Sequence, residues 1–331
     1  MTTTTTTTGE EVVEHGHSPT RPRVRPLAGR IGAEIIGVDI SRALDEAAVD
    51  GIRQALDHWK VVFFRDQELD HEGQIAFGRQ FGELTYAHPL DDAPPDGYPE
   101  IYTVDPRRFA QQYGVDAEQL RKYSYTNGWH TDVTPAVNPP AGSILRADVV
   151  PEFGGDTTFT NLVAAYEGLS EPVRDFVDTL WAEHRYGANP SGLKSATNRF
   201  AGRIDQNPLV ANHPVVRVHP RTKERALFVN PVFTDHVLDV SPLESRWILE
   251  HLFAHLARPE YTVRFHWEPG SVAFWDNRAT AHLGPQDIGH LDVERVLHRV
   301  TLIGDVPIGP EGRESELVEG TPFRSTALFS N

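Results

Sequence analysis

The 331-residue sequence contains no cysteine. This absence excludes disulfides, cysteine-ligated zinc or iron–sulfur sites and thiol nucleophiles, so a transition-metal site must use histidine and carboxylate ligands. No apolar run approaches the roughly 20 residues that a membrane helix requires. The sequence begins with a threonine run in place of a basic and then apolar leader, so we expect a cytoplasmic protein without a signal peptide or a membrane partner.

Basic residues are also few, because 31 Lys and Arg stand against 47 Asp and Glu, which gives a net charge of −16. Such a chain repels phosphate backbones, which argues against a nucleic-acid partner. The length favours one enzyme-sized domain. We expect a disordered Thr-rich arm at residues 1–23, the folded domain at 24–307 and a tail at 308–331. Phe323, Leu328 and Phe329 of the tail could dock on a second copy, so a homo-oligomer (dimer or tetramer) stays open.

Residue periodicity predicts a mainly β-sheet core with flanking helices. A capping box of Ser241, Pro242 and Glu244 marks the clearest helix start. Residues 90–106 contain several prolines and are predicted as a loop. The other helices are predicted over 45–58, from Asp70 onward and over 170–183, and strands over 35–38, 61–64, 261–267, 271–275 and 296–303.

A His-x-Asp/Glu tripeptide with a distant histidine can occupy one face of an octahedral metal site and leave the opposite face open. With 16 histidines and 47 acidic residues, about two such tripeptides are expected by chance. Three occur, and they begin at His130, His266 and His290. The tripeptide alone is therefore uninformative.

Context favours the first of these tripeptides. His266 lies in a predicted strand before a Pro-Gly turn, and His290 lies in a polar loop close to the next histidine. His130 and Asp132 are instead followed, 150 residues after Asp132, by the candidate third ligand His282. That separation leaves room for the rest of a β-barrel between the ligands.

Arg295 and Arg299 are candidate cations for an anionic co-substrate, because a planar guanidinium can bind a carboxylate through two hydrogen bonds. They lie four residues apart in a predicted strand, where even spacing places both on one face. The alternative is that both arginines lie on the surface and form ion pairs with nearby carboxylates.

Five motifs occur in order over about residues 24–307 and together resemble the taurine dioxygenase family of Fe(II)/2-oxoglutarate oxygenases, which includes bacterial alkylsulfatases. The resemblance implies a double-stranded β-helix (jelly-roll) fold with one Fe(II), and 2-oxoglutarate and O2 as co-substrates. The motifs are Trp129-His130-Thr131-Asp132-Val133-Thr134, Gly154-Gly155-Asp156-Thr157, Phe228-Val229-Asn230, Trp275-Asp276-Asn277-Arg278-Ala279-Thr280-Ala281-His282, and His298-Arg299-Val300-Thr301-Leu302 with Gly304-Asp305.

Carried onto this sequence, the resemblance implies that His130, Asp132 and His282 hold the iron. It further implies that Thr157 hydrogen-bonds 2-oxoglutarate and that Arg295 pairs with the distal carboxylate of this co-substrate. Without the resemblance, Thr157 could equally be a turn residue after two glycines.

The resemblance also assigns a substrate pocket. Arg299 would face the anionic group of the substrate or help to hold 2-oxoglutarate, and His88 and Val133 would contact the substrate. Taken alone, His88 could be an ordinary loop histidine. Two departures from the family pattern bear on the substrate: about two extra residues between His282 and Arg295, and an insertion at about residues 106–125.

The implied reaction is hydroxylation of a small organic anion with release of succinate and CO2. An alkyl sulfate or sulfonate, cleaved to an aldehyde plus sulfate or sulfite, fits best. The same chemistry on a carboxylic acid or a specialised metabolite is the alternative. More distant alternatives are a zinc hydrolase with the same two-histidine, one-aspartate ligand set and a non-catalytic jelly-roll binding protein.

Overall fold

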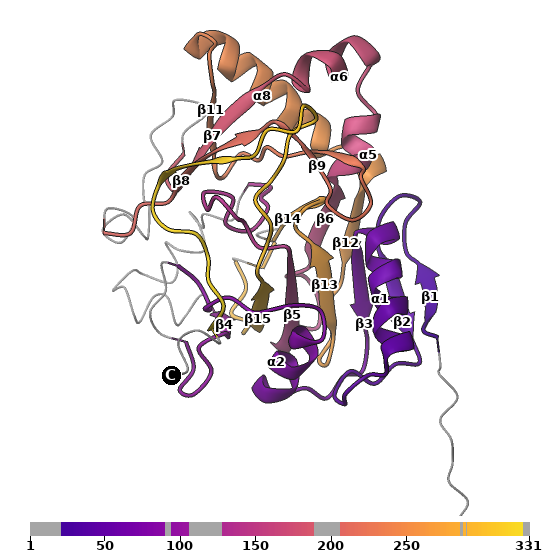
Figure 1. The fold of residues 1–331 in the computed structure, drawn as a ribbon. Coiled ribbons are helices and arrows are strands. Elements are labelled where there is room, and N and C mark those ends of the chain that lie inside the picture. The colour runs from indigo at the N-terminus through magenta and orange to yellow at the C-terminus, as the bar shows by residue number, and fades with distance from the viewer. Residues whose placement is uncertain are drawn as a thin grey trace, which may run out of the picture.

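Two β-sheets packed face to face form the centre of the computed structural model, which describes residues 21–89, 94–105, 128–188, 206–284, 287–288 and 290–326 (Figure 1). Side chains from both sheets interdigitate between them, and the rings of Phe63 and Phe265 stack with their centroids 4.0 Å apart. Trp275 and Phe159 lie in the same buried cluster. This is the jelly-roll fold with flanking helices that the sequence predicts.

The large sheet is antiparallel apart from its β2–β3 pair, and the small sheet is wholly antiparallel. In spatial order the large sheet consists of β1 (Arg23–Pro26), β2 (Ala33–Ile36), β3 (Val61–Phe64), β13 (Val272–Asp276), β5 (Gly142–Val149), β15 (Val296–Leu302) and β4 (Tyr102–Val104). The small sheet consists of β12 (Thr262–Phe265), β6 (Thr157–Asn161) and β14 (Thr280–Leu283). Two further sheets contain β11 (Thr234–Val237), β7 (Trp181–Arg185), β8 (Val210–Pro214) and β16 (Glu316–Glu319), and β10 (Arg225–Leu227) with β9 (Val216–Val218).

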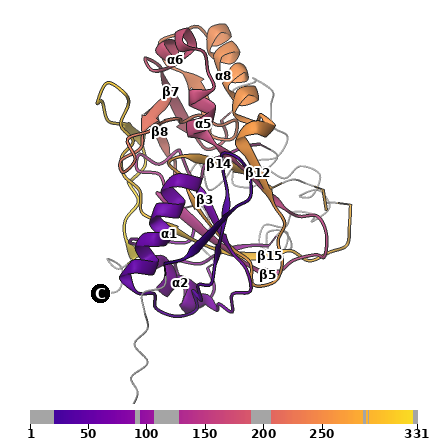
Figure 2. The same ribbon diagram turned by 90° about the vertical axis from the view of Figure 1, so that its right-hand side faces the viewer.

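Helices α1 (Glu46–Trp59) and α2 (His71–Arg79) cover the outer face of the large sheet (Figure 2). The side chains of Asp45 and Asp70 cap them by accepting hydrogen bonds from backbone N–H groups three residues later, both at 2.7 Å. Strand β3 is consequently buried on both faces, one against the helices and one against the small sheet. This explains its unbroken apolar sequence.

Three further helices of the described residues, α5 (Leu162–Glu167), α6 (Glu171–Val177) and α8 (Pro242–Leu256), lie at the top of Figure 1. The short 3-10 helix η2 (Pro259–Tyr261) follows α8 in the chain. The predicted capping box of α8 is present in both directions. The helix predicted over 170–183 is wrong beyond Val177, because Trp181 begins β7. Pairing of β7 with both β8 and β11 overrides the local helical pattern.

Two segments that the sequence predicts as a loop and a tail contain regular structure. The predicted loop at 90–106 contains β4, a three-residue edge strand that pairs with β15. The segment after Pro307, expected as a tail, adds β16 to β8, and its Phe323 exchanges backbone hydrogen bonds with the side chain of Asn138. The insertion at about residues 106–125, residues 1–20, Leu328 and Phe329 lie outside the described residues.

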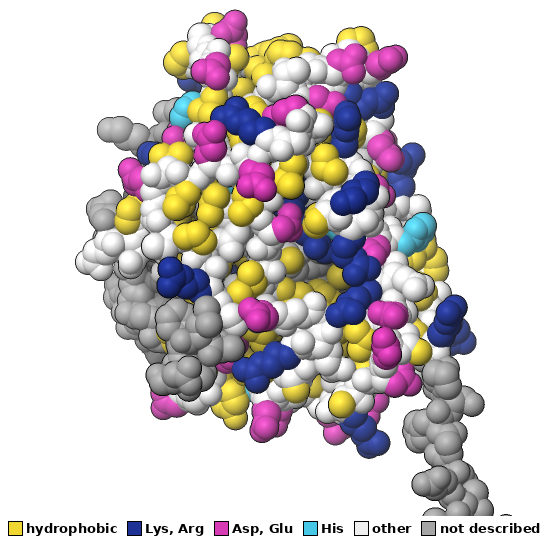
Figure 3. Space-filling view, viewed as in Figure 1, with side chains coloured by type: hydrophobic (Ala, Val, Ile, Leu, Met, Phe, Trp, Pro, Cys, Tyr) yellow, Lys and Arg dark blue, Asp and Glu magenta, His cyan; other side chains and the backbone are white. Residues whose placement is uncertain are grey.

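The face of the molecule drawn in Figure 3 mixes acidic and basic side chains, with hydrophobic side chains spread between them. On this face the net charge of −16 does not take the form of a wholly acidic surface. Within the described part of the chain, no helix has the length and apolar character needed to cross a membrane.

Residues 131–140 are all buried, and a polar cluster behind them holds their backbone. His213 Nε2 lies 2.8 Å from the carbonyl oxygen of Thr134, and its Nδ1 lies 2.7 Å from Ser315 Oγ. The Thr134 hydroxyl in turn contacts His184 Nδ1 at 2.8 Å. The segment is therefore positioned by side chains of β7 and β8 from behind.

We expect acid to destabilise the fold through His213. Burial lowers the pKa of His213 to about 3, from an ordinary 6.5. Because the unfolded chain binds this proton near pH 6.5 and the folded chain does not, His213 contributes stability that is complete above pH 6.5. As pH falls from 6.5 toward 3, this contribution decreases by about 1.4 kcal/mol per pH unit. Urea unfolding between pH 7.5 and 5 should show a shallower loss of stability for His213→Gln than for the wild type; equal slopes would contradict the assignment.

The motif residue Gly304 has a packing role that can be tested. A Cβ at this position would overlap the carbonyl oxygen of Pro139 and lie 2.9 Å from the backbone nitrogen of Ala141. Since backbone atoms cannot rotate aside, we expect Gly304→Ala to lower the free energy of unfolding by about 3 kcal/mol. Chemical denaturation measures the change. Gly29→Ala, which meets no atom within 4 Å, is the matched control, and equal effects of the two substitutions would disprove the close approach.

Candidate metal centre

His130 and His282 face each other across two reciprocal backbone hydrogen bonds. The N–H of each donates to the carbonyl oxygen of the other, at 3.0 and 2.7 Å. In such an antiparallel pair the two side chains leave the backbone on the same face, and here the ring centroids lie 4.2 Å apart. His282 belongs to β14, so the small sheet fixes where His130 lies.

Asp132 completes the group. One potential ligand atom from each of His130, Asp132 and His282 lies within 4.8 Å of the other two. The structure thus brings together the three residues that the sequence nominates. The competing histidines lie elsewhere: His266 Nδ1 pairs with an Asp156 oxygen at 2.9 Å, and His290 is exposed.

The protonation of the group suits a divalent metal. Burial lowers the pKa of His282 to about 3, so its imidazole is neutral at physiological pH. Burial alone would raise the pKa of Asp132, but the Arg299 guanidinium, assisted by both histidines and a hydrogen bond from Ser143, holds it well below its usual range. Two imidazoles and one carboxylate are the donor set of a facial mononuclear iron site.

The surroundings of the two imidazoles also fit a bound metal. Within the described residues, the buried Nδ1 atom of His282 has no hydrogen-bond partner. His130 Nδ1 lies 3.3 Å from the carbonyl oxygen of Gly128, which suits a histidine that donates from one nitrogen and coordinates with the other. The residues present therefore fit a metal ion held between them.

Arg299 lies beside the carboxylate of the group. Its Nη1 donates to Asp132 Oδ1, and its guanidinium lies over the Tyr102 ring at 5.0 Å from the centroid. Arg299 Nε is buried and has no partner among the described residues. A buried guanidinium N–H without an acceptor is a suitable donor to an anion.

Thr157 and Arg295 both lie next to the Gly154-Gly155 turn. Thr157 Oγ1 accepts a hydrogen bond from the Trp267 indole at 2.9 Å, which leaves the hydroxyl proton of Thr157 to donate elsewhere. Arg295 precedes β15, and its Nε donates to the carbonyl oxygen of Gly155 at 2.9 Å. Burial lowers the pKa of Arg295 to about 10, so the side chain remains cationic at neutral pH.

Aromatic rings connect His88 with the metal ligands. His88 stacks on Tyr102 at 4.9 Å and contacts Tyr186 at 6.3 Å. Tyr186 meets Phe233 at 5.2 Å, and Phe233 meets His130 at 6.2 Å. These contacts, with Arg299 over Tyr102, form a continuous wall from one metal ligand to the arginine beside another.

Val133 lies in the same buried cluster as Tyr186 and Phe233 and has a backbone φ of 45°. This left-handed conformation is unusual for a β-branched residue. His88 and Val133, which the resemblance assigns to the substrate pocket, both lie beside this aromatic wall. The sequence analysis did not single out Tyr102, Tyr186 or Phe233. Only Phe233 carried a signal, because it follows closely after the Phe228-Val229-Asn230 motif.

Comparison with known proteins identifies the family of the chain. Residues 23–301 match the family described as "Taurine catabolism dioxygenase TauD, TfdA family". The chain is 41% identical over 298 residues to an alpha-ketoglutarate-dependent sulfate ester dioxygenase of Pseudomonas putida, covering 88% of this chain and 93% of the relative. It is 36% identical over 296 residues to an alkylsulfatase of Acinetobacter baylyi, covering 88% and 87%.

A solved structure shows the same relationship in three dimensions. The crystal structure of a taurine dioxygenase from Burkholderia xenovorans is 49% identical, superposes with a TM-score of 0.77, and covers 92% of this chain and 96% of its own. Sequence and fold agree over nearly the whole domain. The chain belongs to the TauD/TfdA family of dioxygenases.

Proposed function

We propose that this Fe(II)- and 2-oxoglutarate-dependent dioxygenase holds its iron through His130, Asp132 and His282 and oxidises small alkyl sulfate esters or sulfonates. The observation that carries the proposal is the buried group of two imidazoles and one carboxylate beside the cation Arg299. Bound iron supplies activation of O2, coupled to decarboxylation of 2-oxoglutarate to succinate and CO2. Three protein ligands would leave room at the metal for the co-substrates.

Arg295 and Thr157 bind 2-oxoglutarate in this proposal. The guanidinium of Arg295 pairs with the carboxylate farthest from the keto group, and the hydroxyl of Thr157 donates to the same carboxylate. The indole of Trp267 supports this role because it occupies an acceptor site of Thr157 Oγ1 and so directs the hydroxyl proton away from itself. The carbonyl oxygen of Gly155 fixes Arg295 through Nε.

The substrate anion lies between Arg299 and His88, and its alkyl part lies against the wall formed by Tyr102, Tyr186 and Phe233. One cation, one imidazole and apolar rings suit a molecule with an anionic head and a short apolar chain. The relatives that act on sulfate esters and alkyl sulfates support this class. Hydroxylation of the carbon that bears the sulfate oxygen yields an unstable product that collapses to an aldehyde and sulfate.

A zinc hydrolase with the same three ligands would need no 2-oxoglutarate, and Arg295 and Thr157 would have no function in it. A carboxylic acid substrate would use Arg299 equally well. The dioxygenase assignment therefore does not depend on the sulfate, and the two can be tested separately.

The first test is anaerobic binding of 2-oxoglutarate to the Fe(II)-loaded protein. We expect the weak visible charge-transfer band of a chelated keto acid, which His130→Ala should abolish because a ligand is lost. Arg295→Ala should require about 100-fold more 2-oxoglutarate for the same band, since a charge-assisted carboxylate pair is removed. A full band at unchanged 2-oxoglutarate concentration in Arg295→Ala would overturn its assigned role.

The second test concerns the substrate anion. His88→Phe keeps a ring against Tyr102 but removes the imidazole donor, so we expect at least about a tenfold higher KM for hexyl sulfate. Sulfate release gives the rates, and an unchanged charge-transfer band shows that iron and 2-oxoglutarate still bind. If the wild type releases no sulfate from alkyl sulfates but produces succinate with a carboxylic acid, the sulfate ester assignment fails.

A further inference from the structure

A chain of hydrogen bonds runs from Trp275 to the carboxylate of Asp132. Trp275 Nε1 donates to Asn277 Oδ1 at 2.8 Å, Asn277 Nδ2 donates to Ser143 Oγ at 2.9 Å, and Ser143 Oγ donates to Asp132 Oδ2 at 2.6 Å. None of the four residues is more than 3% exposed. Ser143 and Trp275 are direct cross-strand partners on β5 and β13.

The direction of every bond in this chain follows from the indole. An indole N–H can only donate, so the carbonyl oxygen of Asn277 must face Trp275 and its NH2 group must face Ser143. Ser143 Oγ then accepts from the amide, and its single proton is directed to Asp132 Oδ2. Because all four groups are buried, Trp275 determines the direction of the third hydrogen bond, in which Ser143 donates to Asp132.

We infer that Ser143 and Asn277 are positioning residues for Asp132, which fix the orientation of its carboxylate through Oδ2. The inference rests on the metal site proposed above. Arg299 donates to Oδ1, so the two carboxylate oxygens have different partners in the structure. A carboxylate restrained in this way would present its remaining lone pairs to a metal in a fixed direction, which would strengthen binding.

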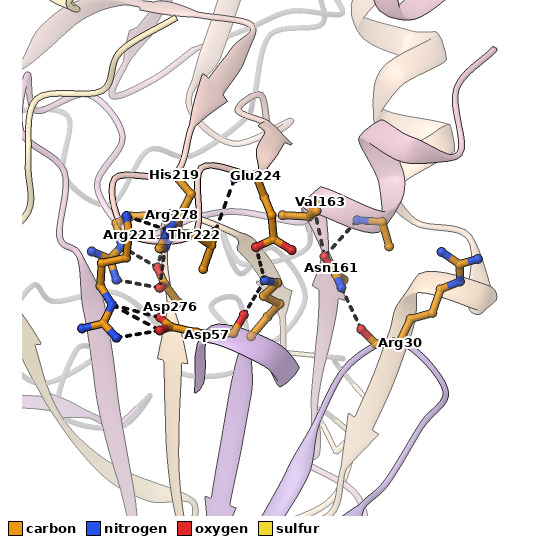
Figure 4. Close-up of polar contacts among 12 residues, drawn as sticks. Arg30, Asp57, Asn161, Val163, His219, Arg221, Thr222, Glu224, Asp276 and Arg278 are labelled. Atoms are coloured by element: carbon orange, nitrogen blue, oxygen red, sulfur yellow. Dashed lines mark hydrogen bonds and ion pairs between the residues drawn. The ribbon is translucent and has the colours of Figure 1, made fainter. Parts of the chain in front are cut away.

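The segment that carries this chain of bonds is itself anchored. Asp276 is buried and pairs with Arg278 at 2.7 Å and with His219 at 2.9 Å (Figure 4). The Trp275 ring also lies 4.9 Å from the ring of His282. The end of β13 and the turn after it therefore contact two of the three proposed ligands: the Trp275 ring packs on His282, and Asn277 reaches Asp132 through Ser143.

Titration of the metal-free protein with Co(II), without 2-oxoglutarate, tests the inference independently of catalysis. We expect Ser143→Ala to weaken Co(II) binding about 10- to 100-fold. Asn277→Asp should weaken it comparably although Ser143 is intact, because an aspartate would accept the Ser143 proton and draw it away from Asp132. Ser143→Thr keeps the hydroxyl and should bind Co(II) more tightly than Ser143→Ala.

Ser271→Ala is the matched control. Ser271 directly precedes β13, and its buried hydroxyl accepts a hydrogen bond from Arg65 and not from a residue of the proposed site. This variant should bind Co(II) as the wild type does. Ser143→Ala that is folded, as judged by near-UV circular dichroism, and binds Co(II) within twofold of the wild type would overturn the inference. If Asn277→Asp does not fold, an equal loss of Co(II) affinity in Ser143→Ala and Ser143→Thr would overturn the inference. Co(II) binding that His130→Ala leaves unchanged would instead overturn the metal site itself.

Discussion

The pair of backbone hydrogen bonds between His130 and His282 is the constraint on which the site depends. It joins two distant parts of the chain in a single antiparallel contact, so the directions of both imidazoles follow from sheet geometry and not from a flexible loop. Asp132 is carried into place by the same segment. Because β14 also pairs with β6, the same contact ties the site to the small sheet.

The arginine charges at the proposed site are opposite in sign to the net charge of the protein. The chain carries a net charge of −16, yet Arg299 is buried beside Asp132 and Arg295 lies against Gly155. Each arginine has a fixed acceptor through one of its nitrogens, which limits its rotation. In the proposed function, anion binding therefore depends on two oriented guanidinium groups, whose field is less screened by solvent than that of exposed arginines.

The sequence predicts the ligand triad because its residues are charged or coordinating and recur in recognisable motifs. It also predicts α1 and α8, whose caps are local in sequence. It fails at residues 178–183 and at β4, where pairing with distant strands decides the structure. Asn277 lies within one of the quoted motifs, but nothing in the sequence connects it with Ser143. The two neutral residues are separated by 134 positions and meet only through the pairing of β5 with β13.

The left-handed backbone of Val133 has a consequence for how this protein can change. A β-branched residue at a φ of 45° costs on the order of 1–3 kcal/mol, and a glycine would relieve that strain. Glycine would also remove the side chain that packs with Tyr186 and Phe233. Because the lost packing offsets the relieved strain, exchange to glycine would gain little stability, and it would remove a side chain from the pocket proposed for the substrate.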